Sequence, residues 1–513
     1  MSDLLLQLLH EQQHLTAVER FSQQHVNEEL PAQQKHYSRL LPATPPAEGQ
    51  QYAFNVDLDQ CSGCKACVTA CHNLNGLDDD EAWRDVGLLI GGTAELPIMQ
   101  HVTTACHHCL EPACATACPV NAYEKNPVTG IVKHLDDQCF GCQYCTLACP
   151  YDVPKYNADK GIVRKCDLCS DRLAVGEAPA CVQACPHEAI SVAVVNVSEV
   201  AAVEELVSTA PKSDFTRPTT RYSGRHPTLA NLAAADEAAL RPQHAHWPLV
   251  IMLVLTQMSV GMFIFTLIFP SAVRSVVALL TGLLALGAST CHLGRPQYAF
   301  RAFIGLRHSW LSREIVAFGG FAAAAMAYTV LQWVPVASAW GTETAGWATA
   351  GSGLLGIYCS VMIYVFTRRE FWSFTQTATK FFLTIVILGT AGSWTAMGTS
   401  ELILPTLPAM LLTASLIKLG FEVVNLRQRR TGLKTQMGRS ALLMTGPLGK
   451  VMAARFALGI FGGVILPCAA LFGHSFGMLS FTSLITCLCG EFAERYVFFA
   501  AVSPDRMPGG LQV

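Results

Sequence analysis

The sequence has few charges of either sign and lacks the signatures of nucleotide or haem chemistry. Only 14% of its 513 residues are charged and the formal net charge is -3, so no strong field would recruit nucleic acid or an acidic surface. There is no C-x-x-C-H run for covalent haem and no P-loop or dinucleotide fingerprint. The first residues have no basic stretch, twin arginine or cleavage site, so no export signal is expected.

Cysteine and long apolar runs occupy different halves of the chain. Most of the 21 cysteines lie before residue 190, and the long apolar runs follow residue 246. A single core rarely extends beyond about 250–300 residues, so two unlike domains are expected. The expected divisions are an N-terminal arm with an amphipathic helix at 1–50, a cysteine-rich domain at 51–200, a linker at 201–245 and a membrane domain at 246–513.

Eight apolar runs after His246 are long enough to cross a bilayer, because about 20 helical residues span its hydrocarbon core. The fifth and sixth runs are interrupted by polar residues and by Pro405 and Pro408. The second half is thus predicted to be an all-α polytopic membrane domain of eight transmembrane helices. The expected spans are 248–269, 275–293, 314–336, 346–366, 381–398, 401–423, 451–472 and 476–500.

Basic residues favour one side of this expected membrane domain. With eight spans, the second, fourth and sixth loops lie on the side of the cysteine-rich domain, and the opposite loops hold only Arg274. Cytoplasmic loops carry the excess of basic residues, so the cysteine-rich domain is predicted to face the cytoplasm at the inner membrane. The basic residues on its side are Arg295, Arg301, Arg307, Arg313, Arg368, Arg369, Lys380, Arg427, Arg429, Arg430, Lys434, Arg439 and Lys450.

Sixteen cysteines form four groups with closely related spacings. Groups one and three have the run C-x2-C-x2-C-x3-C, which is typical of bacterial ferredoxins, and the other two lengthen one gap. The groups are Cys61, Cys64, Cys67 and Cys71; Cys106, Cys109, Cys114 and Cys118; Cys139, Cys142, Cys145 and Cys149; and Cys166, Cys169, Cys181 and Cys185.

Two kinds of metal centre use such cysteines. Zinc is the alternative, because paired C-x2-C motifs also make four-cysteine zinc sites. A zinc site, however, needs only two such pairs. It does not explain why a third and a fourth cysteine follow a few residues further on in each of four groups. The spacing therefore favours four 4Fe-4S clusters, which carry single electrons without needing contact with a substrate.

Over residues 51–200 these motifs resemble the four-cluster iron-sulfur subunit of the DMSO reductase family of molybdoenzymes. The resemblance implies an α+β double-ferredoxin-like fold in which groups one and four, and groups two and three, exchange ligands. Some relatives replace one ligand and hold a 3Fe-4S cluster, whereas this sequence has cysteine at every position. The implied sets are Cys61, Cys64, Cys67 and Cys185; Cys71, Cys166, Cys169 and Cys181; Cys106, Cys109, Cys114 and Cys149; and Cys118, Cys139, Cys142 and Cys145.

Residues 246–513 resemble the eight-helix membrane anchor subunit of the same family. Three segments carry this resemblance: CHLGRPQYAFRAF at 291–303, SREIVAFG at 312–319 and GEFAERYVFF at 490–499. Matched by position, His292 and Glu314 fall where the family places its quinol-reactive pair. Quinone chemistry moves two protons with two electrons, and an imidazole and a carboxylate are suited to exchange them. The alternative is that His292 only caps the second span and Glu314 the start of the third.

The other polar and sulfur-bearing residues of the membrane half are expected to be structural. Glu491 and Arg495 lie one turn apart in the last span, where a salt bridge would lower the cost of burying them. The membrane-half histidines lie at span edges or in loops, so no haem b is expected. The remaining cysteines are expected to be packing residues: Cys291, Cys359, Cys468, Cys487 and Cys489.

The resemblance also implies a separate catalytic subunit with molybdenum bis(pterin guanine dinucleotide). The predicted cytoplasmic face favours oxidation of a substrate such as sulfite, with electrons entering the quinone pool. A quinol-oxidising subunit of a DMSO-type reductase is the alternative. Two readings of other classes stay open, a structural or transporter-like anchor and a redox-sensing membrane protein.

Overall fold

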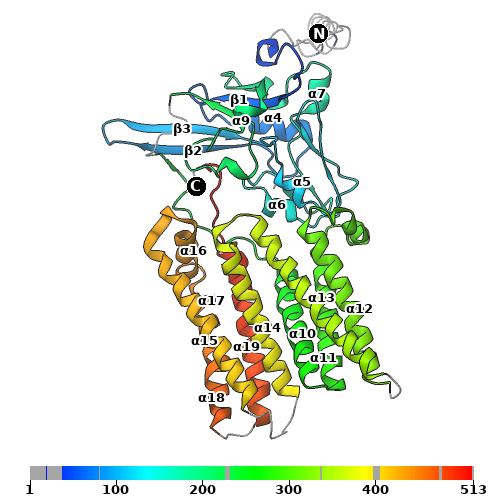
Figure 1. The fold of residues 1–513 in the computed structure, drawn as a ribbon. Coiled ribbons are helices and arrows are strands. Elements are labelled where there is room, and N and C mark those ends of the chain that lie inside the picture. The colour runs from blue at the N-terminus through cyan, green and yellow to red at the C-terminus, as the bar shows by residue number, and fades with distance from the viewer. Residues whose placement is uncertain are drawn as a thin grey trace, which may run out of the picture.

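The computed structural model describes residues 37–79, 81–225, 232–334, 338–396, 405–472 and 476–510, together with Glu19 and Gln23. The amphipathic helix expected near the N-terminus lies outside these residues. The chain forms two stacked parts, a domain of small sheets and short helices and a bundle of long helices (Figure 1). The C-terminal tail returns from the bundle to the first part.

Two three-stranded sheets and two strand pairs organise the first part, with the orders β8-β1-β9 and β10-β2-β3 in the larger sheets. All strand pairs are antiparallel except β1 with β9. Residues of the expected linker therefore contribute β9 and β10. The strands are β1 (Gln50–Asp57), β2 (Asp85–Gly92), β3 (Pro97–Thr104), β4 (Tyr123–Lys125), β5 (Val132–His134), β6 (Lys155–Asn157), β7 (Ile162–Arg164), β8 (Ile190–Asn196), β9 (Arg221–Ser223) and β10 (Ala233–Ala234).

The pairing of β1 with β8 joins the two ends of the cysteine-rich sequence. Val56, which is fully buried, lies opposite Ile190 in this register. Cys61 follows Val56 by five residues, and Cys185 precedes Ile190 by five. Because antiparallel partners run side by side in opposite directions, the first and last cysteine groups meet at the same end of the sheet.

Short helices follow or lie between the cysteines. α4 packs against α8, and α5 packs against α6, so the helices pair in the same way as the cysteine groups. The helices of this part are α4 (Ala66–Asn75), α5 (Ala113–Ala117), α6 (Tyr144–Ala148), α7 (Ser170–Ala174), α8 (Ala180–Gln183) and α9 (Val197–Val200), with 3-10 turns η1 (Ser38–Leu40) and η2 (Ser213–Phe215).

Long helices make up the second part. η6 (Phe461–Ile465) is a π-helical turn that joins α17 to α18 within one rod. α13 and α14 begin seven residues before the expected positions 346 and 381, because a hydropathy count leaves out their polar first turns. The helices are α10 (Trp247–Ile268), α11 (Ala272–Thr290), α12 (Trp310–Leu331), α13 (Ala339–Phe366), α14 (Phe374–Ala396), α15 (Thr406–Arg427), α17 (Gly449–Ile460), α18 (Leu466–Leu471) and α19 (Phe476–Ala500).

Six helical segments among the described residues are long and apolar enough to cross a membrane, with mean hydropathies of 1.5 to 2.1. α14 and α19, of 23 and 25 residues, lie beside them in the same bundle and contact each other and α10 (Figure 1). The six segments are Trp247–Ile268, Ala272–Thr290, Trp310–Leu331, Ala339–Phe366, Thr406–Lys434 and Gly449–Leu471.

The loops between the helices attach the bundle to the first part. Ser309 Oγ donates to the carbonyl of Ala117 at 2.6 Å, and Arg369 Nη2 donates to the carbonyl of Leu147 at 3.0 Å. The second and fourth loops therefore lie on the side of the cysteine-rich domain. The other elements at this end are η3 (Pro296–Gly305), η4 (Glu370–Trp372), η5 (Gln428–Lys434) and α16 (Gln436–Thr445).

Candidate functional site

The first and third cysteine groups fold into the same loop. Gly63 and Gly141 have φ angles of 73° and 72°, and Lys65 and Gln143, which follow the second cysteine of each group, both have φ of 60°. Glycine adopts positive φ at no steric cost, whereas other residues rarely do. Lys65 and Gln143 are also the N-caps of α4 and α6. Each loop therefore leads directly into a short helix that carries the third cysteine of its group.

The sixteen cysteines gather in four sets of four. Sets A, B and C line cavities of about 290, 280 and 370 Å³ respectively. Set D lies in one buried group whose thiols are within electrostatic reach of one another. The membership is the one that the family resemblance implies. Set A is Cys61, Cys64, Cys67 and Cys185; set B is Cys71, Cys166, Cys169 and Cys181; set C is Cys106, Cys109, Cys114 and Cys149; set D is Cys118, Cys139, Cys142 and Cys145.

The surroundings of the sets fit thiolate-bound clusters. Zinc draws four sulfurs to about 2.3 Å from one point, whereas sets A to C are arranged around cavities; no group in the described residues converges closely enough to hold a single metal ion. Backbone amides donate to ligand sulfurs, from Ala122 to Cys118 at 3.2 Å and from Ala189 to Cys185 at 3.3 Å. Such hydrogen bonds stabilise the negative charge of a thiolate-bound cluster.

A buried arginine lies between sets A and B. Arg84 is 2% exposed and within electrostatic reach of Cys67 of set A and Cys181 of set B. Its Nε and Nη2 have no hydrogen-bond partner, and Nη1 donates to Thr103 Oγ1 at 3.0 Å. Burial raises the pKa of the Cys71 thiol to about 12, and the charge of Arg84 opposes that shift. Arg84 thus supplies positive charge where thiolates are otherwise costly.

A buried lysine lies between sets B and C. Lys165 is 3% exposed; its Nζ is 3.6 Å from Cys106 Sγ of set C and donates to the carbonyl of Cys166 of set B at 2.8 Å. The sequence analysis missed both cations. Lys165 directly precedes a cysteine, which is a usable signal, whereas nothing in the sequence near Arg84 marks its position.

Set D contacts the membrane part through the loop that follows His292. The amide of Arg295 donates to the carbonyl of Phe140 at 3.0 Å, and the amide of Gly294 to that of Gly141 at 3.4 Å. A Cβ atom on Gly294 would lie 2.1 Å from the carbonyl oxygen of Gly161, so only glycine fits there. The loop that follows His292 is therefore seated directly on the loop that holds Cys139 and Cys142.

His292 lies at the end of α11 with its side chain half-buried. Its Nδ1 hydrogen bonds to the carbonyl of Ser289, which is the capping contact expected under the structural alternative. A carbonyl only accepts, so Nδ1 carries the proton and Nε2 is left as an acceptor. Burial lowers the pKa of His292 to about 4, so its imidazole is neutral near pH 7.

Glu314 lies in the second turn of α12 and is 6% exposed. Its carboxylate accepts a hydrogen bond from Ser360 Oγ of α13, and α12 has no side-chain cap. No hydrogen bond or ion pair joins Glu314 to His292 in the described part of the chain. Tyr144, which lies between Gln143 and Cys145, is within electrostatic reach of Glu314 and donates to the carbonyl of Ile363 at 3.1 Å. Tyr144 therefore lies between set D and Glu314.

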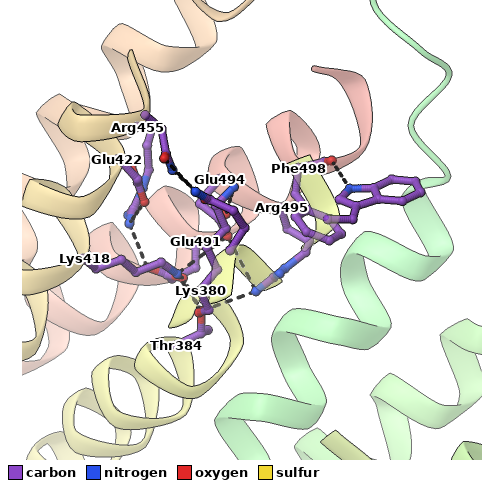
Figure 2. A network of polar contacts seen from close by, with 12 residues as sticks. Lys380, Thr384, Lys418, Glu422, Arg455, Glu491, Glu494, Arg495 and Phe498 are labelled. Carbon is purple, nitrogen blue, oxygen red and sulfur yellow. Dashed lines mark hydrogen bonds and ion pairs between the residues drawn. The ribbon is translucent and has the colours of Figure 1, made fainter. Parts of the chain in front are cut away.

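A network of charged side chains lies inside the bundle (Figure 2). The expected salt bridge between Glu491 and Arg495 was wrong: Glu491 pairs with Lys418 and Arg455, and Arg495 is 3.5 Å from Glu494. Cross-helix partners replace the neighbour one turn away because α15 and α17 bring cations to Glu491. The sequence analysis singled out only two of these residues for pairing. The network is Lys380, Lys418, Glu422, Arg455, Glu491, Glu494 and Arg495.

Known proteins resemble part of this polypeptide. The probable anaerobic dimethyl sulfoxide reductase chain YnfG of Escherichia coli strain K12 is 35% identical over 185 residues, which are 33% of this protein and 86% of the relative. An anaerobic dimethyl sulfoxide reductase chain of Haemophilus influenzae is 34% identical over 179 residues, 33% and 87% of the two proteins. The hydrogenase-2 operon protein HybA of Escherichia coli O157:H7 is 32% identical over 226 residues, 39% and 65% of the two proteins.

Family models match the two parts separately. Residues 98–195 match the 4Fe-4S dicluster domain, and residues 242–501, about half of the chain, match the DMSO reductase anchor subunit (DmsC). The chain therefore belongs to the DMSO reductase anchor subunit family and carries a 4Fe-4S dicluster domain in the same polypeptide.

Proposed function

We propose that this chain is the electron-transfer and membrane-anchor subunit of a molybdenum bis(pterin) oxidoreductase, and that it joins a separate catalytic subunit to the quinone pool. The observation that carries the proposal is the succession of four cysteine sets, the last of which is seated on the His292 loop. Four 4Fe-4S clusters held by sets A to D would supply one-electron transfer. The relatives named as dimethyl sulfoxide reductase chains support a catalytic partner of that kind.

The protein's own residues would bind quinone and exchange its protons beside set D. Glu314 is buried next to Ser360, and Tyr144 lies between it and the set D loop. His292 is neutral near pH 7 and presents Nε2 as an acceptor, so it can accept a hydrogen bond from a quinol hydroxyl. An acid and a base of this kind are suited to the two protons that accompany two electrons at a quinone ring.

The membrane arrangement follows from the bundle. α14 and α19 would cross the bilayer with the six apolar segments, because both lie in the bundle and shield their charged residues inside it. That gives eight spans, with a double-ferredoxin-like domain on the side of the basic loops, facing the cytoplasm. Quinone protons would then be exchanged on that side.

The favoured direction is from a substrate, such as sulfite, to quinone. A quinol-oxidising wire of a DMSO-type reductase is the second candidate, favoured by the printed names of two relatives. A redox sensor would need only one cluster as its switch, whereas sixteen cysteines in contiguous sets favour conduction.

The test is reoxidation of the full-length protein by quinone. Protein in lipid nanodiscs is reduced with dithionite, freed of excess reductant and mixed with a short-chain quinone, and iron-sulfur absorbance is followed by stopped flow. Glu314→Gln and His292→Gln should slow reoxidation by on the order of 100-fold, the usual worth of a positioned acid or base.

The matched control is Glu343→Gln, which removes an exposed carboxylate at the other end of α13. It should reoxidise at the wild-type rate. If Glu314→Gln and His292→Gln also do so, the quinone site is wrongly placed.

A further inference from the structure

Every residue of the charged network inside the bundle is buried. Its seven side chains come from α14, α15, α17 and α19, and none is more than 5% exposed. Four are cations and three are carboxylates. Ionisable groups at membrane depth are costly and mark ion or proton pathways more often than simple packing.

Two of the three carboxylates form close ion pairs with cations. Glu422 receives the fork of Arg455, with N–O distances of 2.9 and 3.2 Å. Glu491 pairs with Lys418, accepts from Thr384 Oγ1 at 2.7 Å and lies 3.1 Å from Arg455. These two carboxylates hold α15, α17 and α19 together, which is a structural role.

Glu494 differs from both. Within the described part of the chain neither of its oxygens accepts a hydrogen bond, although the side chain is 3% exposed. The cations nearest to Glu494 lie at longer N–O distances than those of the other two carboxylates: Arg495 at 3.5 Å, Lys418 at 3.6 Å and Lys380 at 3.9 Å. Buried polar groups are usually satisfied, so these two oxygens are available to a bridging water or a proton.

A cavity adjoins Glu494 on the side of the cysteine-rich domain. It is lined by Glu494, Lys380, Asn425 and Met444, among others, and has room for about one water molecule. Asn425 exchanges two hydrogen bonds with Gln376, of 2.9 and 2.7 Å, next to this cavity. Met444 belongs to α16, at the end of the bundle that faces the first part. The cavity therefore leads from the network toward that end.

Polar side chains also lie between Glu494 and Glu314. Tyr364 of α13 is within electrostatic reach of both Glu314 and Arg495. Arg495 donates to Gln257 at 3.0 Å, while its Nε and Nη1 have no partner. Figure 2 shows the side chain of Arg495 directed toward Thr384 of α14. Water at these unpaired atoms would complete a line from the quinone-site carboxylate to the cavity.

We propose that Glu494 carries protons between Glu314 and the cavity beside Asn425, so that the charged network is the proton path of the quinone site. The proposal rests on the proposed function. When quinone is reduced, two electrons from the reduced clusters and two protons convert its two carbonyl oxygens to hydroxyls. Glu314 gives up a proton to the ring, Glu494 replaces that proton through water, and solvent at the end of the bundle re-protonates Glu494 by way of the cavity.

The surrounding charges suit a transient carrier. Lys380 of α14, Lys418 of α15, Arg455 of α17 and Arg495 of α19 face Glu494, against the carboxylates of Glu422 and Glu491. These four cations offset the negative charge that Glu494 and the two other carboxylates carry between proton transfers.

The test uses reoxidation of the dithionite-reduced, full-length protein by short-chain quinone, in H2O and in D2O. Glu494→Gln should slow reoxidation by on the order of 100-fold and enlarge the solvent isotope effect, while EPR signals of the reduced clusters stay unchanged. Glu343→Gln is the control and should match wild type. Asn425→Leu, which obstructs the cavity without changing charge, should slow the reaction as well.

The outcomes separate the two proposals. A wild-type rate and isotope effect in Glu494→Gln, with a slow Glu314→Gln, would overturn the proton path and leave the quinone site standing. A wild-type rate in Glu314→Gln would overturn both. If Glu494→Gln does not accumulate in membranes, a wild-type rate in Asn425→Leu overturns the path by itself.

Discussion

At the scale of single residues, the positions of two buried cations explain how clusters of like charge can follow one another. Arg84 lies between sets A and B, and Lys165 between sets B and C. Reduction adds negative charge to a cluster, so a fixed cation nearby favours the reduced state.

Replacing Lys165 by methionine should therefore lower the midpoint potentials of the clusters on sets B and C. The expected fall is on the order of 50–100 mV, the scale of one unit charge several ångströms away at an effective dielectric constant of about 20. Redox-titrated EPR measures it. Lys133→Met, which removes a solvent-exposed lysine paired with Asp171, should leave all potentials unchanged; an equal shift in both variants would contradict the assignment.

The stability of the folded His292 loop is expected to depend on pH. Its pKa of about 4 in the folded protein lies below the ordinary value near 6.5. The folded loop therefore binds fewer protons than the open loop in that window, and its stability, complete above about pH 6.5, falls as pH drops toward 4.

Amide hydrogen exchange across 291–295 should show protection falling by at most about tenfold per pH unit below about pH 6, after correction for intrinsic rates. His292→Asn, which keeps a donor for the Ser289 carbonyl, should remove this dependence. Protection that is flat in wild type over the same range would show that the imidazole is not held neutral.

At the scale of elements, close glycine contacts seat one loop on another. Gly294 lies against Gly161 and Gly141, so any side chain at 294 must push the His292 loop away from set D. Gly294→Ala should slow reoxidation by quinone, because electron transfer weakens with distance, while the cluster potentials stay unchanged.

Gly287→Ala on α11 is the matched control, since a Cβ there meets nothing within 4 Å. A wild-type rate in Gly294→Ala would show that the contact between set D and the His292 loop does not limit electron transfer.

Elements that depend on residue spacing and hydropathy could be predicted from the sequence. The cysteine groups and the long helices are of this kind. The arrangement of cysteines from groups one and four in common sets depends on the pairing of β1 with β8, across more than 130 residues. The spacing of the cysteines within each group does not predict this pairing. The family resemblance implied it, and the register of Val56 with Ile190 gives the physical reason.

Within the bundle, single charged residues were the hardest to interpret. Lys418 stands alone in an apolar run, and its partner Glu491 is 73 residues away on another helix. Only the packing of α15 against α17 and α19 shows that the charges are paired. His292 and Glu314 were matched by position, yet the structure joins them through Tyr144 and the set D loop rather than by direct contact.

At the scale of the whole molecule, one polypeptide places a succession of cysteine sets on top of a membrane bundle. The C-terminal tail strengthens this union, because the amide of Leu88 donates to the carbonyl of Gly509 at 3.0 Å and Arg506 pairs with Asp236 at 2.5 Å. A fixed junction keeps set D at a constant distance from the His292 loop, which the proposed electron transfer to quinone would require.

Redox-titrated EPR with spin quantitation, on membranes that contain the full-length protein, tests the central claim most directly. Four 4Fe-4S signals per polypeptide are expected, and a quinone-site inhibitor should alter only the signal that Cys142→Ser removes or changes. Fewer than four signals would contradict the assignment of sets A to D. An inhibitor effect on any other signal, or none at all, would contradict the junction of set D with the quinone site.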